Sequence, residues 1–263
     1  MNAFEAIVLG IIQGLTEFLP ISSSGHLEIG KAFFGSQFGA DESLFFTLTL
    51  HVATALSTLV VFRKDIVNLL KGLLAFNNNE SVQFSIKILI SMLPAVGVGL
   101  FFQNQIEALF SQNLVLVGAM LCLTALVLFI ADRSVKTGKS ITTLQAFVVG
   151  IVQAIAILPG ISRSGSTIAA AVVLGVHREK AARFSFLMVL PLIFGSMAKK
   201  LLDAESLHLS IALTPLILGF IASFISGILA CKWMIALVKK SQLKYFSLYC
   251  LFVGGIAFIY GLF

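Results

Sequence analysis

The sequence predicts an all-α polytopic membrane protein with an inverted-topology repeat, about six transmembrane helices and two broken re-entrant helical hairpins. Three observations lead to this fold class: a low charge content, a series of long apolar runs and a motif that occurs twice. Of the 263 residues, 58% are hydrophobic and 11% are charged. Soluble domains carry roughly 25% charged residues, and a single soluble core could not bury this much apolar surface. The composition excludes an ordinary cytosolic enzyme, a secreted module and a disordered chain.

Six long apolar runs supply the expected transmembrane helices. Each is near the ~20 residues that a helix needs to cross a bilayer, and their continuity is unlike the short alternating strands of a membrane β-barrel. The runs cover residues 46–62, 86–102, 114–130, 184–198, 211–230 and 245–262. Two further apolar segments, 3–34 and 141–176, are broken in the middle by Pro, Gly and Ser. These two segments are the predicted hairpins.

The Lys and Arg residues predict the orientation in the membrane. Of the 18, 14 lie in four stretches that the positive-inside rule places in the cytoplasm. These stretches are 63–87, 131–140, 177–183 and 231–244, and the loops around 31–44, 103–113 and 199–208 then face outward with both termini. This orientation requires the first broken segment to dip in from outside and the second from inside. Lys199 and Lys200 fit it least well, and the residues alone leave open whether each hairpin is re-entrant or crosses fully.

An internal repeat supports this arrangement. Gly-Ile-Ile-Gln at 10–13 matches Gly-Ile-Val-Gln at 150–153, and Leu-Pro-Ile-Ser-Ser-Ser-Gly at 19–25 resembles Leu-Pro-Gly-Ile-Ser-Arg-Ser-Gly at 158–165. The alternative is a chance similarity of two Ser/Gly turns. We expect the two copies to form one integral-membrane domain that spans 1–263.

Each repeat contains one hairpin and three spans, the first over about 1–135 and the second over about 141–263. Because three is an odd number, the second copy is turned upside down relative to the first. Paired broken helices of inverted repeats form a binding site where the two breaks meet within the membrane.

The first break carries a carboxylate, hydroxyl groups and an imidazole. Gln13 and Glu17 are four residues apart and share one helix face, and Pro20 then disrupts the helix. The serines at 22–24 suit the N-terminal cap of the next helix, and His26 lies in its first turn.

The second break has the properties of an anion site. Gly160 and Gly165 let the backbone bend closely around a ligand, and the helix that resumes there presents free N–H groups. Arg163 adds a planar cation suited to phosphate oxygens. Thr167, four residues later, can face the same ligand.

A charge at the bilayer centre costs about 2.5–3.5 kcal/mol on insertion scales, so Glu17 and Arg163 are functional hypotheses, with a structural ion pair as the alternative. For His26 and the serines the alternative is helix capping. The candidate catalytic residues are Glu17, Ser23, His26 and Arg163, and the candidate substrate-binding residues are Gln13, Ser22, Ser162, Ser164 and Thr167. Such a set can bind a phosphate, activate a nucleophile and stabilise developing charge.

Other residues carry weaker signals. His51 lies in an apolar span without a charged neighbour in sequence, so we expect a packing or hydrogen-bonding role, although its repeat-related position is Pro191. His177 and His208 are expected in loops. The three cysteines have no paired spacing for a disulfide or zinc. The net charge of +6 is explained by loop residues, so no nucleic-acid partner is expected.

The two motifs resemble those of the undecaprenyl-diphosphate phosphatases of the bacitracin-resistance family. Gln13-xxx-Glu17 with Ser-Ser-Ser-Gly-His26 corresponds to the [E/Q]xxxE element of that family. Pro159-Gly-Ile-Ser-Arg-Ser-Gly-Ser-Thr167 corresponds to its PGxSRSxxT element. The resemblance covers essentially the whole chain.

The resemblance implies a hydrolase of the bacterial inner membrane, with its active site toward the periplasm. It implies that undecaprenyl diphosphate loses its terminal phosphate, which returns the carrier lipid to peptidoglycan synthesis and confers bacitracin resistance. The implied partners are a polyprenyl diphosphate and membrane lipid, and the oligomeric state is not predicted. The residues carried over from the family motifs are Gln13, Glu17, Ser23, His26, Ser162, Arg163 and Thr167.

The resemblance implies no tightly bound cofactor, although Mg²⁺ or Ca²⁺ often accompanies activity in this family. The family often has Glu at the first motif position, whereas this chain has Gln13, which cannot ionise. Glu17 is therefore the only candidate metal ligand in the motif, and the metal site stays open. In the expected mechanism His26, oriented by Glu17, activates Ser23 or a water.

Two alternatives are weighed against this interpretation. Phosphatases of the phosphatidic-acid type also use Ser-Gly-His and Ser-Arg elements, but they require a His where this chain has Ala169, and their preceding basic motif is missing. A transporter or flippase of lipid phosphates would use the same repeat and anion site. His26 together with Glu17 favours the enzyme, because binding alone does not require them.

Overall fold

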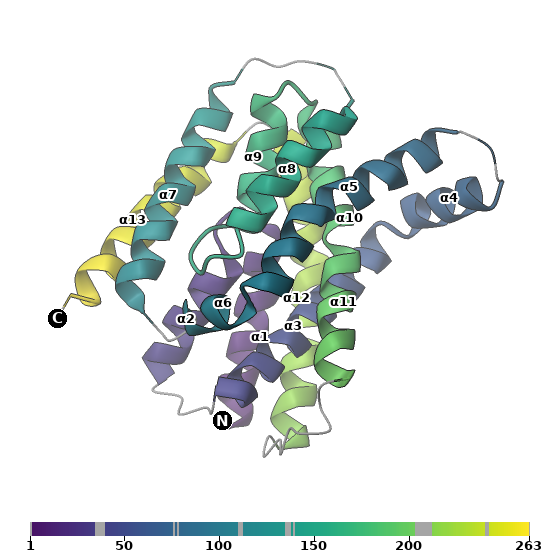
Figure 1. The fold of residues 1–263 in the computed structure, drawn as a ribbon. Helices are drawn as coiled ribbons and strands as arrows, with labels where there is room; N and C mark the ends of the chain where they lie inside the picture. Colours follow the sequence, from purple (N-terminus) through teal and green to yellow (C-terminus); the bar gives the residue numbers. More distant parts are fainter. Residues whose placement is uncertain are drawn as a thin grey trace.

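The computed structural model describes residues 2–34, 40–75, 77, 79–109, 113–134, 138, 140–202, 212–239 and 242–262. Every regular element within these ranges is a helix, labelled α1 to α13 in Figure 1. The all-α part of the predicted fold class is confirmed.

Within the described residues, five helical segments are long and apolar enough to cross a membrane, and a bent pair of helices, counted as one span, makes a sixth. The five are Glu80–Phe101 (α5), Leu114–Asp132 (α7), Arg178–Lys199, Leu213–Val238 and Leu243–Tyr260 (α13). Arg178–Lys199 combines α10 (Arg178–Met188) with most of α11 (Leu190–Leu202), and Leu213–Val238 belongs to α12 (Leu213–Lys239). These segments match the apolar runs, so the predicted polytopic membrane protein with about six spans is confirmed.

The bent pair joins Phe45–Val61 of α3 (Ala40–Val61) to α4 (Arg63–Leu74) with a bend of 78°. The predicted basic stretch 63–87 therefore contains a helix and the beginning of α5. Helix α4 leaves Val67, Leu70 and Leu74 exposed between its charged residues. Its apolar and charged residues alternate at helical spacing, which explains why this polar stretch is still helical.

The two broken segments form the expected hairpins. Helix α1 (Ala3–Phe18) precedes α2 (Ser23–Phe34), and α8 (Thr143–Ile155) precedes α9 (Arg163–Val173). The 16 residues of α1 span about 24 Å, which is less than the ~30 Å hydrocarbon core. In Figure 1, α1 begins at the lower end of the molecule and α8 at the upper end, and α2 and α9 each run back toward the end they came from. This is the geometry of two re-entrant hairpins that enter from opposite sides.

The hairpins pack in equivalent ways against the other half of the chain: α1 lies along α12, and α8 lies along α5. Gly10 of α1 contacts the backbone of Gly219, and Gly150 of α8 contacts the backbone of Ser91. A side chain at either glycine would collide with the neighbouring helix backbone. The glycines of the repeated Gly-Ile-x-Gln motif are thus the points of close helix approach.

The predicted outward loops are shorter than expected. Helix α2 continues through Lys31 to Phe34, α3 begins at Ala40, and α11 continues through Lys199 to Leu202. Two lysines that the sequence placed in loops, Lys31 and Lys199, therefore lie on helices. Lys31 is buried there because Glu28 of the same helix pairs with it, whereas Lys199 is exposed. Of the two histidines expected in loops, His177 lies just before the first residue of α10 and has a non-helical backbone, as expected. His208 lies outside the described residues.

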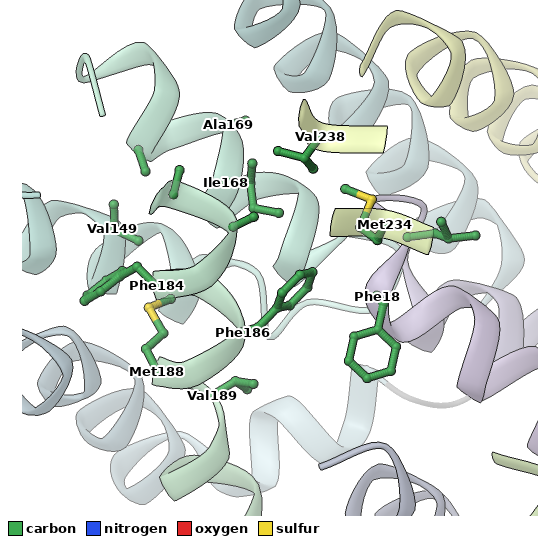
Figure 2. Packing of buried hydrophobic residues seen from close by; sticks show 14 of the residues in the cluster. Phe18, Val149, Ile168, Ala169, Phe184, Phe186, Met188, Val189, Met234 and Val238 are labelled. Carbon is green, nitrogen blue, oxygen red and sulfur yellow. The ribbon is translucent and has the colours of Figure 1, made fainter. Parts of the chain in front are cut away.

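The buried core joins the two halves around α10, as Figure 2 shows. The Phe186 ring of α10 meets the Phe18 ring of α1 edge-on, with centroids 5.6 Å apart. Met234 of α12 and Ile168 of α9 belong to the same cluster. Because Phe18 directly follows Glu17, this packing holds the C-terminal end of α1 in place.

Candidate active site

The tips of the two hairpins meet inside the molecule. The Ser164 hydroxyl of the second tip donates to the Leu19 carbonyl of the first, at 3.3 Å. A Cβ atom on Gly25 would lie 3.1 Å from the Cα atom of Gly160, and one on Gly165 would lie 3.0 Å from the Pro20 side chain. The two breaks therefore come together, as the repeat predicts, and glycine is needed for their close approach.

Ser22 and Ser162 occupy equivalent positions and both hold the turns of the breaks. Ser22 has a left-handed backbone (φ 71°), and its hydroxyl accepts from the Gly25 N–H at 3.2 Å. The Ser162 hydroxyl accepts from the Gly165 N–H at 3.1 Å and caps α9. Thr124 of α7 supports the second turn, because its hydroxyl accepts from the Ser162 N–H at 3.0 Å. Both serines act as caps.

Glu17 is the centre of the polar cluster between the tips. Its side chain is buried and forms an ion pair with Arg163 at the start of α9. One carboxylate oxygen, Oε2, accepts from Gln13 Nε2 at 2.9 Å and from the Ser23 hydroxyl at 2.7 Å. The structure thus brings together three candidate residues of the first motif and the arginine of the second.

His51 of α3 also reaches this cluster, with Nε2 3.6 Å from Glu17 Oε2. Its other nitrogen, Nδ1, lies 2.8 Å from the Thr47 carbonyl, which can only accept. The hydrogen-bonding role expected for His51 is therefore present, but its contact with Glu17 was not predicted. The sequence contains one indication that His51 lies near the core, because its repeat-related position is Pro191. The contact itself depends on the packing of α3 against α1, which the sequence did not predict.

His26 lies apart from Glu17. Its Nδ1 is 2.8 Å from the Ser22 carbonyl, and its Nε2 is 2.8 Å from the hydroxyl of Tyr249 on α13. The two rings are stacked, with centroids 5.6 Å apart and planes 10° apart. In this structure Ser23, not His26, contacts the carboxylate, and the catalytic role of His26 stays a prediction.

A small cavity adjoins the Glu17–Arg163 ion pair. Thr167 is not among the residues that line this cavity. Its hydroxyl donates to the Arg163 carbonyl at 2.7 Å and lies 2.5 Å from the hydroxyl of Ser185 on α10, which does line it. The cavity is lined by the polar residues Glu17, Thr54, Thr58, Arg163, Ser164 and Ser185, and by the apolar residues Phe18, Ala55, Phe186, Val189 and Ile193. The sequence did not predict the contributions of Thr54, Thr58 and Ser185, because isolated hydroxyls are common in membrane helices.

The donor set does not fit a divalent cation held by the protein alone. Among the described residues, no group of three or more His, Cys, Asp or Glu side chains converges. Glu17 is the acidic residue of the cluster, and Arg163 neutralises it. The buried Oε1 atom of Gln13 has no hydrogen-bond partner in the described structure. A single amide oxygen beside a neutralised carboxylate is a poor site for Mg²⁺ or Ca²⁺, which prefer several oxygen ligands.

The fold and the cluster define a class: polytopic membrane proteins in which two opposed re-entrant hairpins enclose a buried carboxylate, a guanidinium and several hydroxyl groups. The chain belongs to the bacitracin resistance protein BacA family, whose family model matches residues 6–256.

The chain is similar to three curated relatives that are each named undecaprenyl-diphosphatase. The relative from Christiangramia forsetii is 59% identical over 260 residues, covering 99% of this chain and 98% of the relative. The relative from Bacteroides fragilis strain YCH46 is 49% identical, covering 98% of both chains. The relative from Methanococcus vannielii is 39% identical, covering 97% of this chain and 99% of the relative.

Proposed function

We propose that the protein hydrolyses undecaprenyl diphosphate to undecaprenyl phosphate and inorganic phosphate. The observation that carries the proposal is the Arg163–Glu17–Ser23 cluster: an anion-binding cation, a carboxylate and a hydroxyl in contact inside a membrane protein. The names of the full-length relatives support the same reaction. The reaction would recycle the carrier lipid for peptidoglycan synthesis and confer resistance to bacitracin.

Arg163 binds the diphosphate in this proposal. It is the first residue of α9, so its side chain and the positive end of the helix act on the same anion. The guanidinium exchanges Glu17 for phosphate oxygens and stabilises the charge on the transferring phosphoryl group. The polyprenyl tail stays against apolar helix faces in the lipid.

Glu17 becomes the base when the substrate takes over Arg163. Losing its positive partner makes the carboxylate a better proton acceptor, and the Ser23 hydroxyl already donates to it at 2.7 Å. The proton of Ser23, or of a water in its place, moves to Glu17 as the oxygen attacks the terminal phosphorus. The bond from that phosphorus to the bridging oxygen breaks, and undecaprenyl phosphate leaves. If Ser23 attacks, water then hydrolyses the phosphoserine.

The proposed setting is the inner membrane, with the site open to the periplasm and the basic stretches in the cytoplasm. We also propose that Mg²⁺ or Ca²⁺, where activity needs it, arrives with the diphosphate, since the described side chains offer no multi-ligand cation site. Purified protein would then contain less than about 0.1 divalent ion per chain, far below the full occupancy of a dedicated site.

The direct test is phosphate release from C55 diphosphate by purified protein. The wild type should release phosphate, and Arg163→Ala should abolish release. Arg133→Ala is the matched control, because Arg133 lies over the Phe129 ring at the end of α7, away from the cluster. Normal turnover by Arg163→Ala would contradict the assignment of Arg163 to the active site.

A lipid-phosphate transporter is the alternative that the fold itself supports, since opposed broken hairpins also occur in transporters. Reconstituted liposomes separate the two functions. Movement of a labelled lipid phosphate across the bilayer without phosphate release would favour the transporter.

A further inference from the structure

The hydrogen bonds of His26 define its protonation pattern. Nδ1 lies 2.8 Å from the Ser22 carbonyl oxygen, and a carbonyl can only accept, so Nδ1 carries the hydrogen. In the neutral ring Nε2 is then an acceptor. The Tyr249 hydroxyl, 2.8 Å from Nε2, is therefore the donor of that hydrogen bond.

Tyr249 belongs to a helix far from His26 in sequence, yet the contact is well built. The two residues are 223 positions apart, and their rings stack almost in parallel. Tyr249 is 42% exposed, so its phenol lies at the edge of the molecule rather than in the core. The His26–Tyr249 pair is therefore not required for packing of the core.

Helix α13 is held against α7 and the first hairpin by other contacts. The Ser247 hydroxyl donates to the Ala125 carbonyl of α7 at 2.6 Å, and the buried Cys250 thiol donates to the Pro20 carbonyl at 3.7 Å. Gly254 packs closely on Gly118 of α7. These contacts fix the position of α13 without the Tyr249 hydroxyl. The hydrogen bond of that hydroxyl to His26 is therefore not needed to hold α13 in place.

We infer that Tyr249 is a positioning residue for His26: its ring stacks on the imidazole and its hydroxyl donates to Nε2, so that the imidazole keeps one orientation in the first turn of α2. The inference rests on the proposed function and on the Ser-Ser-Ser-Gly-His motif, which makes His26 a candidate catalytic residue three positions after Ser23. Tyr249 acts through His26 and does not itself react.

The first test is Tyr249→Phe, which removes the hydroxyl and keeps the ring stack. We expect kcat to fall about tenfold with KM changed less than about twofold, because one oriented hydrogen bond is lost while the binding groups remain. Tyr245→Phe on the same helix is the matched control; it is 58% exposed and should leave kcat unchanged. Wild-type kcat in Tyr249→Phe would overturn the inference.

A double-mutant cycle separates positioning from a general structural effect. In a His26→Ala background, Tyr249→Phe should cause no further loss, because there is no imidazole left to position. A loss that multiplies with that of His26→Ala would overturn the inference.

The third measurement does not depend on activity. The ¹⁵N signal of His26 Nε2, assigned by its disappearance in His26→Ala, should shift in Tyr249→Phe and stay in place in Tyr245→Phe. An unshifted signal overturns the inference. If the wild type hydrolyses no polyprenyl diphosphate but the signal shifts, the proposed function fails while the positioning contact stands.

Discussion

Arg163 and Glu17, 146 residues apart in sequence, form an ion pair where the tips of the two hairpins meet. Each is a charged residue that lies at the break of its own hairpin. Pairing neutralises both charges, which makes their burial tolerable. In the proposed function the diphosphate replaces Glu17 at Arg163, so binding of the substrate and activation of the base are coupled.

The stability of the tips should depend on this pair. Arg163→Met leaves Glu17 buried without its cation, and breaking a buried pair costs about 3–5 kcal/mol. Thermal unfolding in detergent should show a lower midpoint for Arg163→Met than for the double variant Arg163→Met/Glu17→Gln, which removes both charges. Equal midpoints for the two variants would mean that the pair adds nothing to folding.

Ser23 is expected to be essential for fast turnover. Ser23→Ala should lower kcat by a factor on the order of 10² or more, as for the loss of an activated nucleophile. Ser24→Ala is the control, since Ser24 contacts Ser22 at 3.3 Å rather than Glu17. Rapid quenching and mass spectrometry should find phosphate on Ser23 in the wild type. Fast turnover by Ser23→Ala would assign the attack to water.

His51 should support Glu17 at Oε2, the same carboxylate oxygen that accepts from Ser23. His51→Ala removes the ring that lies 3.6 Å from the carboxylate, and we expect kcat to fall about tenfold, a loss of the size of one oriented polar contact. His51→Asn keeps a polar group near Glu17 and should recover part of this activity. A kcat of the wild-type value in His51→Ala would show that the contact has no part in catalysis.

A second buried ion pair, Glu28–Lys31 on α2, should matter for stability rather than for chemistry. Lys31 Nζ lies 3.1 Å from Glu28 Oε1, and both side chains are nearly inaccessible. Lys31 also donates to Ser43 at 2.9 Å and to Thr47 at 3.1 Å, which ties α2 to α3.

Lys31→Met should destabilise the protein by about 3–5 kcal/mol, and adding Glu28→Leu should recover much of this loss. Lys232→Met, an exposed position on α12, is the control. Thermal unfolding measures all three. An unchanged midpoint for Lys31→Met would contradict the proposed tie between α2 and α3.

The proposed orientation predicts opposite accessibility at two exposed positions. In a background without the three native cysteines, Phe33→Cys at the end of α2 should react with a membrane-impermeant maleimide in intact spheroplasts. Ser140→Cys, between α7 and α8, should react only after lysis. The reverse pattern would place the basic stretches outside.

Much of the fold could be predicted because hydropathy is a local property. The apolar runs, the helix breaks at Pro20 and Pro159, and the matched glycines of the repeat are all visible in short windows of sequence. The cluster could be predicted in part, because membrane charges are rare enough that Glu17 and Arg163 stand out. The loops are shorter than the charges of Lys31 and Lys199 predict, because both lysines lie on helices.

The sequence by itself determined the class of fold, the two hairpins and the polar residues they carry to the centre. Only the tertiary structure decided which of these touch: that Ser23 and His51 contact Glu17, that His26 turns to Tyr249, and that Lys31 is buried with Glu28. The physical reason is that helix formation follows from neighbouring residues, whereas the rotation of each helix about its axis is set by packing against helices distant in sequence. A rotation of one residue, about 100°, is enough to exchange one partner for another.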